Sequence, residues 1–344
     1  MAPTPTKTFV ITGGAGFVGS NLAAALAKRF PGADLVVVDD FRSGSFANLV
    51  EAFSRSSLPP FAGRVIAGLF AAVDWEAILR DREVAAVFHE AAITDTTVTN
   101  EPEMLRVNAE ASETLMRACA RAHVPLVYAS SAATYGTPAE AGDRRPFPLA
   151  AAGSPSNVYG FSKWVMECNH RRVAGVSGEP PWIVGLRYFN VFGPGESRKG
   201  KMSSMIYQLA QQMLTGKRPR LFADGSQARD QVYIEDVVEC TLAAAGLGEL
   251  KRPAPGVYNV GSGVATSFND IGAALRRGLG LAEGELPTEF FEMPPSVRAF
   301  YQDYTCADLS ETQRGLGWRP RWKPFDAVAH YASILKSERR PSAG

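Results

Sequence analysis

A tyrosine and a lysine four residues apart could form an acid–base unit. Tyr159 and Lys163 lie in the stretch SPSNVYGFSKW, whose Ser, Asn and Pro-rich beginning is typical of a helix start, and on a helix this spacing places both side chains on one face. A phenol with a pKa of about 10 is a poor base at neutral pH, but a nearby ammonium and the positive charge of an oxidised nicotinamide would favour the phenolate and lower that pKa. Tyr159 could then take a proton from a carbinol whose carbon loses hydride.

A serine upstream would complete this unit. Ser131 stands at the end of the serines in YASSAATYG, and its hydroxyl could hold the reacting oxygen beside Tyr159. Taken alone, a tyrosine and a lysine at this spacing are more often structural, and Ser130 or Ser131 could equally cap a turn. The order of the segments, a glycine loop, an acid-ended strand, a serine-rich strand end and then Tyr-x-x-x-Lys, favours a redox site.

A glycine-rich turn near the beginning of the chain could hold the hydride acceptor. Gly13, Gly16 and Gly19 follow the apolar run TFVIT and begin an Ala and Leu-rich helix. Glycines there give the turn its backbone angles and let N–H groups approach a pyrophosphate. Asp39 ends the next apolar run, where a carboxylate can accept hydrogen bonds from an adenosine ribose. A plain packing turn would also use glycines, but the order of these segments predicts a dinucleotide site, with Lys163 on the nicotinamide ribose.

The residues after the second apolar run leave the choice between NAD and NADP open. Asp39 and Asp40 would repel the 2′-phosphate of NADP, whereas Arg42 could bind it. The sequence therefore predicts NADP or NAD as the cofactor.

Strands that alternate with helices must position these residues. The apolar runs at 8–12, 33–40, 85–92, 125–136 and 182–194 are typical of buried strands, and 103–122 repeats its apolar residues at helical spacing. This alternation predicts an α/β fold, a doubly wound parallel sheet of Rossmann type. We expect residues 1–189 to form the dinucleotide-binding domain and 190–344 mainly a smaller, interleaved substrate lobe, with segments near 232–262 returning to the first domain.

The totals exclude several classes of protein. The 344 residues carry a formal net charge of +1 with the basic residues spread out, so nucleic acid is not an expected partner. The sequence contains no run that approaches the length of a membrane span and no apolar core of a signal peptide. The four cysteines lack metal-ligand spacing, which predicts reduced thiols, no metal and a cytoplasmic setting.

Four motifs resemble the extended short-chain dehydrogenase/reductase superfamily, which contains the nucleotide-sugar epimerases and dehydratases. They are TGGAGFVGSNL, YASSAATYG, YGFSK and RYFNVFGPGE, and the similarity runs nearly from end to end. Within the superfamily, VFHEAA, GESRKGKM, RDQVYIEDV and YQDYTCADL resemble the ADP-L-glycero-D-manno-heptose 6-epimerases.

The resemblance implies a cytoplasmic enzyme of lipopolysaccharide precursor synthesis. It would invert C6 of an ADP-linked heptose through a 6-keto intermediate, with tightly bound NADP or NAD and without net redox. The resemblance also implies that the chain forms a homo-oligomer.

The resemblance also supplies a second base, Lys199. An epimerase must deprotonate hydroxyls that point in two directions, and one fixed base reaches both poorly. Lys199 lies in the loop PGESRKGK after NVFGP, and burial near other cations would lower its pKa and suit it to this role. Most basic runs of this kind are only solvated loops, but the position after NVFGP favours the functional interpretation.

Other site residues follow from the same motifs. We expect the residues that contact the cofactor to be Gly13, Gly16, Phe17, Val18, Gly19, Asp39, Asp40, Arg42, Glu90, Ala91, Ala92, Asn108, Tyr159, Lys163, Val191 and Lys199. We expect the residues that contact the nucleotide-sugar to be Ser131, Asn190, Lys201, Gln208, Leu221, Phe222, Arg229 and Tyr301. Arg229 would bind the diphosphate with its forked guanidinium, although it could instead pair with Asp230, and Tyr301 could merely pack a short strand.

Several positions depart from the family pattern. Lys201, Gln208 and Phe300 replace the usual serine, histidine and arginine, SGSF after Arg42 lacks a lysine that accompanies the 2′-phosphate, and AGLF lacks an acid expected near the adenine. These changes surround the ligands, so another nucleotide-sugar or stereocentre stays open.

Two other kinds of function stay in view. A related UDP-sugar 4-epimerase, dehydratase or keto-sugar reductase is one alternative. A 4-epimerase would not require Lys199, and a dehydratase would place acidic residues where this chain has Ala132 and Ala133. A non-catalytic NAD(P)-binding sensor tends to lose the tyrosine or the lysine of the pair, and both are present here.

Overall fold

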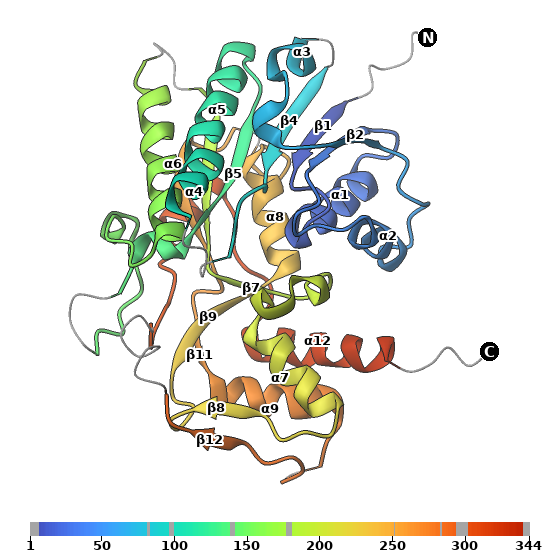
Figure 1. The fold of residues 1–344 in the computed structure, drawn as a ribbon, viewed down its shortest axis with the longest axis vertical. Coiled ribbons are helices and arrows are strands. Elements are labelled where there is room, and N and C mark those ends of the chain that lie inside the picture. The colour runs from blue at the N-terminus through green and yellow to red at the C-terminus, as the bar shows by residue number, and fades with distance from the viewer. Residues whose placement is uncertain are drawn as a thin grey trace.

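A parallel sheet forms the centre of the larger part of the molecule (Figure 1). The structure is a computed structural model, and it describes residues 7–80, 83–95, 100–137, 142–176, 181–250, 252–282, 284–293 and 302–339. Within these ranges the sheet has seven strands in the order β10-β6-β5-β4-β1-β2-β3. The strands are β1 (Thr8–Thr12), β2 (Asp34–Asp39), β3 (Arg64–Ala67), β4 (Val84–His89), β5 (Leu126–Ser131), β6 (Ile183–Tyr188) and β10 (Gly256–Val260).

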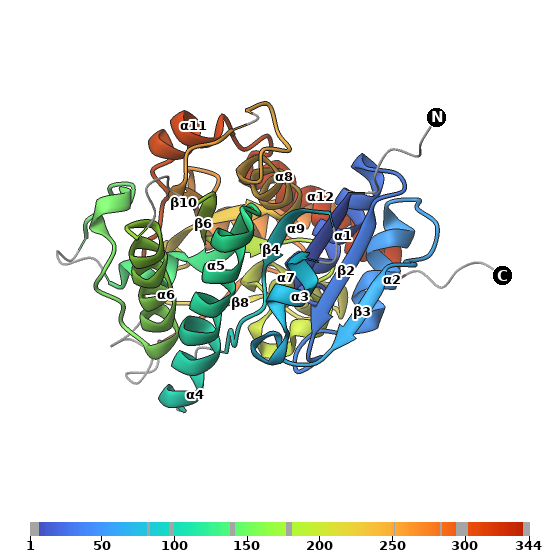
Figure 2. The same cartoon turned by 90° about the horizontal axis from the view of Figure 1, so that it is seen from above.

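Helices cover both faces of this sheet (Figure 2). One face carries α3 (Trp75–Arg80), α5 (Ala111–Ala122) and α6 (Val158–Ala174). The other face carries α1 (Phe17–Arg29) and α8 (Ile234–Ala244), with α2 (Phe46–Arg55) against α1. Short helical segments connect them: Phe70–Ala72, α4 (Glu101–Leu105), Arg106–Glu110, Ala132–Tyr135 and Leu149–Ala151.

The strands are apolar on both faces because both faces are covered. Val10 and Val87 point into the cluster with α3, α5 and α6, whereas Phe9 and Ile11 point into the cluster with α1 and α8. Alternation along the strand sends neighbouring side chains to opposite faces, so a sheet buried on both sides reads as a continuous apolar run. The prediction of a doubly wound α/β fold is confirmed.

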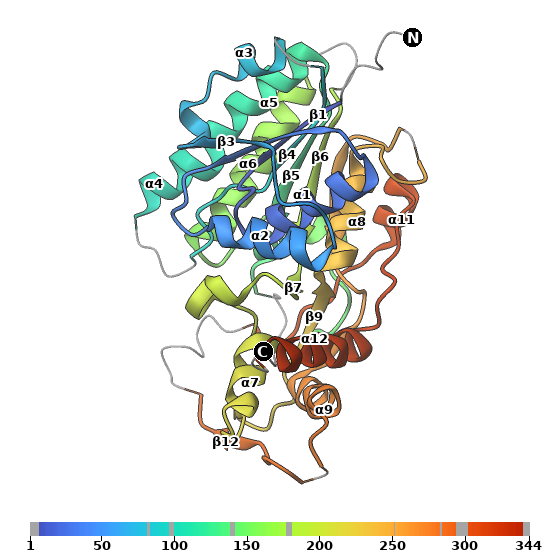
Figure 3. The same ribbon diagram turned by 90° about the vertical axis from the view of Figure 1, so that its right-hand side faces the viewer.

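A smaller lobe lies below the sheet (Figure 3). Its strands are β7 (Asn190–Phe192), β8 (Arg220–Phe222), β9 (Ala228–Tyr233), β11 (Ala265–Ser267) and β12 (Glu289–Phe291). Its helices are the segment Ser197–Met202, α7 (Met205–Leu214), α9 (Phe268–Leu279) and α12 (Pro324–Glu338), whereas α11 (Ser310–Leu316) packs against β10 and α8 beside the sheet (Figure 3). The chain enters this lobe where β6 ends at Tyr188 and β7 begins at Asn190, and it returns to the sheet as β10 beside β6. The domain limits at residues 189 and 190 stay a prediction.

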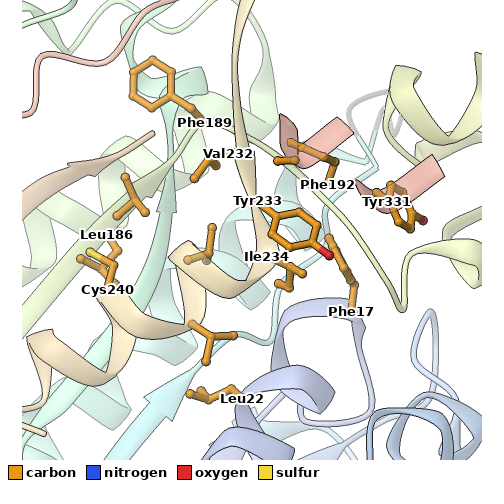
Figure 4. Close-up of a cluster of buried hydrophobic side chains, with 14 of the residues drawn as sticks. Phe17, Leu22, Leu186, Phe189, Phe192, Val232, Tyr233, Ile234, Cys240 and Tyr331 are labelled. Carbon is orange, nitrogen blue, oxygen red and sulfur yellow. The ribbon is translucent and has the colours of Figure 1, made fainter. Parts of the chain in front are cut away.

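One continuous apolar cluster joins the two parts (Figure 4). Phe192 at the end of β7 packs against Tyr233 with ring centres 5.4 Å apart, and against Tyr331 of α12 at 6.2 Å. Phe17 of α1 belongs to the same buried cluster. The cluster therefore fixes the lobe against the first helix of the sheet domain, close to the glycine turn.

None of the helices that the structure describes is both long and apolar enough to span a membrane.

Candidate active site

A cavity of about 960 Å³ lies at the carboxyl ends of the strands and reaches the lobe. In doubly wound sheets this edge is where ligands bind, beside the strands at which the order reverses, here β1 and β4. The predicted residues that line the cavity are Gly13, Gly16, Phe17, Val18, Gly19, Asp39, Asp40, Arg42, Glu90, Ala91, Ala92, Ser131, Tyr159, Lys163, Asn190, Val191, Lys199, Lys201 and Arg229. The fold thus brings most of the predicted site together.

The glycine turn is packed too closely for side chains. Gly13 has a φ of +67°, and a Cβ on it would lie 2.6 Å from the backbone nitrogen of Ala91. A Cβ on Gly19 would lie 2.2 Å from the carbonyl oxygen of Gly13. Helix α1 begins after Gly16 without a side-chain cap, so its first N–H groups are available to a phosphate. This backbone cradle fits the pyrophosphate of a dinucleotide.

Asp39 uses its carboxylate on the backbone of the turn. Its oxygens accept hydrogen bonds from the N–H of Ala15 at 2.9 Å and of Phe41 at 2.8 Å. Burial raises the pKa of Asp39, and the two backbone hydrogen bonds oppose that rise. Asp39 therefore holds the glycine turn against the end of β2, in addition to lining the cavity.

Arg42 is engaged with carboxylates at the same end of the cavity. Its Nε lies 3.5 Å from an oxygen of Asp40, and its Nη1 lies 3.2 Å from an oxygen of Glu103, the residue after Pro102 in α4. Two carboxylates thus pair with one guanidinium here. Glu103 adds a negative charge to those of Asp39 and Asp40, which are expected to repel a 2′-phosphate, and no sequence motif signalled it.

Tyr159 lies in the first turn of α6 beside Ser131. The Asn157 side chain caps this helix by accepting from the N–H of Gly160 at 2.8 Å. A Cβ on Gly160 would lie 2.5 Å from the carbonyl oxygen of Ala133, so glycine lets the helix approach the end of β5. This approach joins the Tyr159 and Ser131 side chains in a hydrogen bond, which lowers the pKa of Tyr159.

Lys163 is buried behind the tyrosine, with 2% of its surface exposed. Its Nζ donates to the carbonyl oxygen of Ala129 at 2.7 Å and lies 5.9 Å from the centre of the Tyr159 ring. Burial lowers the pKa of Lys163 to about 8, and the charges of Glu90 and Glu167 oppose this change.

The pKa of Tyr159 is not lowered overall. Burial raises it, the hydrogen bond from Ser131 opposes that rise, and the charge of Glu90 adds to it. In the protein alone the shift of this pKa comes from burial, Ser131 and Glu90, and the Lys163 ammonium is bonded to a carbonyl. The expectation that this ammonium and an oxidised nicotinamide together favour the phenolate stays a prediction. Further positive charge is needed in the cavity before Tyr159 becomes a base.

A buried ion pair holds α6 against the sheet. Glu167 of α6 and Arg187 of β6 lie 2.7 Å apart with 0% and 3% of their side chains exposed. Ser130 donates to the same carboxylate at 2.6 Å. This network fixes the ends of β5 and β6 relative to the helix that carries Tyr159 and Lys163.

Lys199 enters the cavity from the loop after β7. Its Nζ lies 5.3 Å from the centre of the Phe17 ring, and burial lowers its pKa while the charge of Glu196 opposes that change. Glu196 is buried and holds the loop by accepting from the N–H of Gly193 at 3.1 Å and the hydroxyl of Ser204 at 2.9 Å. The cause of the lowered pKa is burial itself, whereas the sequence analysis also expected neighbouring cations.

The substrate side of the cavity combines residues of the lobe. Arg229 donates to Oε1 of Gln302 at 3.2 Å, and Asn190 donates to the carbonyl of Asp230 at 2.9 Å. The Asp230 carboxylate accepts from the backbone N–H groups of Ser262, Gly263 and Ala307. Asp230 thus holds loops of the lobe, which supports a role for Arg229 other than pairing with its neighbour.

Four of the predicted residues lie away from the cavity lining. Asn108 is buried and bonds both backbone groups of Ile93, at 2.8 and 2.9 Å. Gln208 donates to the carbonyl of Ser203 at 2.9 Å, Leu221 is 2% exposed in the core, and Phe222 packs on Phe291. These contacts hold segments that line the cavity, and ligand contact by these four stays a prediction. Tyr301 and Phe300 lie outside the described residues.

Other lining residues were not foreseen in the sequence. They include Tyr188, Arg198, Glu103 and Asp95. Asp95 lies 3.4 Å from Lys201, so this pair connects the segment after β4 with the lobe across the cavity. The position of Tyr188 in RYFN, two residues before Asn190, was the available signal for it.

The comparison with known families assigns the chain. A model of the NAD dependent epimerase/dehydratase family matches residues 9–261. The chain belongs to the NAD dependent epimerase/dehydratase family. The glycine cradle, the Tyr159–Lys163 pair and the cavity at the carboxyl edge of the sheet are the features of this family member that can hold a dinucleotide and a second ligand.

Solved structures of related proteins match this chain over almost its whole length. ADP-L-glycero-D-manno-heptose-6-epimerase from Helicobacter pylori is 33% identical, with a TM-score of 0.80, and the match covers 96% of both chains. MoeE5, in complex with UDP-glucose and NAD, is 27% identical with a TM-score of 0.74 over 96% of this chain and 99% of that one. UDP-N-acetylglucosamine 4-epimerase from Methanobrevibacter ruminantium is 24% identical with a TM-score of 0.81, over 97% of this chain and 100% of that one, and this likeness concerns the fold.

Proposed function

We propose that this epimerase/dehydratase family member inverts C6 of an ADP-linked manno-heptose, converting the D-glycero to the L-glycero form. The observation that carries the proposal is that Tyr159 and Lys199 line one cavity from different parts of the fold. Tyr159 comes from α6 of the sheet domain and Lys199 from the loop after β7. The 33% identity with the heptose epimerase of Helicobacter pylori over 96% of each chain supports the substrate.

Inversion requires proton transfer at a carbinol and at the ketone formed from it. The bound nicotinamide dinucleotide supplies the hydride acceptor and then the donor. Tyr159, held by Ser131, takes the proton of the hydroxyl in one epimer and returns it in the reverse reaction. Lys199 does the same for the other epimer, whose hydroxyl points in another direction. Burial raises the pKa of Tyr159 and lowers that of Lys199. The charge of the bound ligands must therefore adjust these pKa values for proton transfer.

The remaining contacts orient the substrate. Arg229 can hold a diphosphate with two parallel N–H donors, and Asn190 stands beside it on β7. Water exclusion follows from the position of the lobe over the sheet edge. The 6-keto intermediate turns between Tyr159 and Lys199 before it is reduced on its other face, and no net redox occurs.

NAD is the cofactor that fits this cavity better than NADP. Arg42 is paired with Asp40 and Glu103 at the ribose end, and Asp39 lines the same cavity, so a 2′-phosphate would meet an excess of negative charge. A ribose hydroxyl instead can donate to a carboxylate there. The absence of a lysine in SGSF supports the same choice.

The setting of the enzyme belongs to the same proposal. A nucleotide-sugar is the small-molecule partner, the cytoplasm is the compartment, and the chain works as a homo-oligomer. The four unpaired cysteines, of which Cys119, Cys240 and Cys306 are buried, are in keeping with a reducing compartment.

A UDP-hexose 4-epimerase is the second candidate. Lys201 and Gln208 depart from the heptose-epimerase pattern on the substrate side, and Lys201 faces Asp95 across the cavity. Lys201 alters the cavity lining itself, whereas Gln208 donates a hydrogen bond to Ser203 of that lining.

The deciding experiment is a substrate assay on the purified protein. Denaturation and chromatography first identify any released dinucleotide. Incubation with ADP-D-glycero-D-manno-heptose, followed by NMR of the C6 position, is expected to show conversion to the L-glycero epimer. No change at C6, together with inversion of a UDP-hexose at C4, would replace the first proposal by the second.

A further inference from the structure

A chain of polar groups begins at Glu90 and runs away from the cavity into the core. The carboxyl oxygen Oε1 of Glu90 lies 2.9 Å from the hydroxyl of Tyr188, which lies 2.9 Å from Oγ1 of Thr241. Oγ1 of Thr241 lies 2.8 Å from the carbonyl oxygen of Val237, one turn earlier in α8. Glu90 and Tyr188 both line the cavity, whereas Thr241 is fully buried.

These three contacts need three hydrogens. The carbonyl of Val237 supplies none, and the hydroxyls of Tyr188 and Thr241 supply one each. If Glu90 is ionised, one of the three close oxygen–oxygen contacts has no hydrogen in it. If Glu90 is protonated, each oxygen donates to the next, from Glu90 to Tyr188 to Thr241 to Val237. Only the protonated carboxyl makes all three contacts hydrogen bonds.

The groups around Glu90 decide what its proton controls. Lys163 and Tyr159 face it from α6 and Tyr188 from β6, whereas Cys240 and Thr241 of α8 face Tyr188. On its own strand, the neighbouring His89 is fully buried between Thr12 and Ser112, at 2.7 and 2.8 Å, and burial lowers its pKa to about 3, so it is neutral. The glycine turn packed on the Glu90–Ala91 backbone has no ionisable side chain. Lys163 is thus the cation whose charge an ionised Glu90 would offset.

We propose that Glu90 is a protonated carboxylic acid in the resting protein and a positioning residue whose ionisation sets the proton affinity of Tyr159 and Lys163. With Glu90 neutral, the ammonium of Lys163 is not offset and favours the phenolate of Tyr159. With Glu90 ionised, the phenol of Tyr159 holds its proton more tightly. Glu90, Tyr159 and Lys163 influence one another through their charges. The hydrogen bond of the Glu90 side chain is to Tyr188 and not to Tyr159 or Lys163.

The direction of each pKa agrees with the proton count. Burial raises the pKa of Glu90 to about 7, against the opposing influence of Tyr188 and Lys163. The charge of Glu90 raises the pKa of both Tyr159 and Lys163. The influence of Glu90 on Tyr159 during the reaction rests on the proposed function. The protonated state of Glu90 in the resting protein does not rest on it.

Infrared spectroscopy of the protein without substrate tests the protonation. The difference between the spectra of the wild type and Glu90→Gln isolates this carboxyl. At about pH 6, where an ordinary glutamate is ionised, we expect the carbonyl stretch of a protonated acid in the wild type, replaced by carboxylate bands as the pH rises through about 7. Carboxylate bands already present at that lower pH would overturn the proposal.

Thr241→Val tests the chain itself without touching the cavity. The variant removes the acceptor for the Tyr188 hydrogen, so that hydrogen must go to Glu90, and an ionised Glu90 then satisfies the remaining contact. We expect the infrared titration of Glu90 to move to lower pH by about one unit, the size expected for one neutral hydrogen bond. An unchanged titration would mean that the contacts do not hold the proton.

Tyrosinate absorbance tests the coupling to Tyr159. Each protein is titrated beside its own Tyr159→Phe counterpart, so the difference reports Tyr159 alone. Above about pH 7 the wild-type Glu90 is ionised, and we expect Tyr159 to ionise at lower pH in Glu90→Gln than in the wild type. Coincident titrations would refute the coupling, and since the measurement needs no substrate, that failure is distinct from a failure of the epimerase proposal.

Discussion

Lys163 Nζ lies 5.9 Å from the centre of the Tyr159 ring and donates its hydrogen bond to the carbonyl of Ala129, 2.7 Å away. The lysine thus acts on the phenol through space, while Ser131 makes the direct contact. Ser131 therefore orients the phenol, while Lys163 lies near its ring and is bonded to the strand β5.

Tyr159→Phe is expected to lower the rate of C6 inversion by about 10² to 10⁴-fold, the usual contribution of a positioned acid–base group. The substitution keeps the ring and removes only the hydroxyl bonded to Ser131, so we expect unchanged circular dichroism. NMR of the heptose gives the rate. Near-full activity would mean that Tyr159 is not the proton acceptor.

Lys199→Met is expected to lower the rate at which the two epimers interconvert by about 10²-fold or more, because one epimer loses its base. The other epimer still meets Tyr159, so it should still be oxidised once, which the absorbance of reduced nicotinamide reports after mixing. The exposed Lys217→Met, beyond α7 and outside the cavity lining, is the matched control and should leave the rate unchanged. Equal losses in both half-reactions would contradict the two-base scheme.

NAD is expected to bind at least about tenfold more tightly than NADP, which corresponds to about 1.4 kcal/mol, because carboxylates crowd the ribose end. Asp40→Ser should reduce that preference, since it removes one charge and frees one contact of Arg42. Asp143→Ser, at an exposed pair with Arg145, is the control. Calorimetric titration of the stripped protein measures both affinities, and a preference for NADP would refute this assignment.

Glu167→Gln is expected to lower the free energy of unfolding by about 3 to 5 kcal/mol, because it leaves Arg187 buried without its counter-charge. Glu76→Gln breaks an exposed pair with Arg121 and should cost less than about 1 kcal/mol. Urea unfolding compares the two. Similar small losses would mean that the pair does not hold α6 on the sheet.

The free energy of unfolding of the wild type, relative to Glu90→Gln, is expected to fall as the pH rises from about 4.5 to about 7. Between these values the folded protein keeps a proton on Glu90 that the unfolded chain has released, so a rising pH favours unfolding. Below this window both states are protonated and above it both are ionised, so the difference is constant there. Urea unfolding at several pH values measures it, and a difference that rises with pH would contradict a buried neutral acid.

The sequence by itself determined the features that depend on near neighbours in the chain. Local backbone geometry and side-chain size explain three of these features. They are the need for glycine at Gly13, the formation of strands by the apolar runs, and the position of Tyr159 one helical turn before Lys163. The fold class followed from the order of such segments, and the family from the resemblance of its motifs. Lys199 could be named because its loop resembles the corresponding loop of the heptose epimerases.

Only the tertiary structure decided the electrostatics of the site. Glu90 and Tyr188 are 98 positions apart and meet because β4 and β6 end at the same edge of the sheet. The carboxylates that pair with Arg42 come from the residue after β2 and from α4, and Asn108 holds Ile93 behind the cavity. Burial and distant charges set the pKa of a side chain, so the sequence could name Tyr159 and Lys163 as a pair but could not predict that burial and Glu90 raise the pKa of Tyr159.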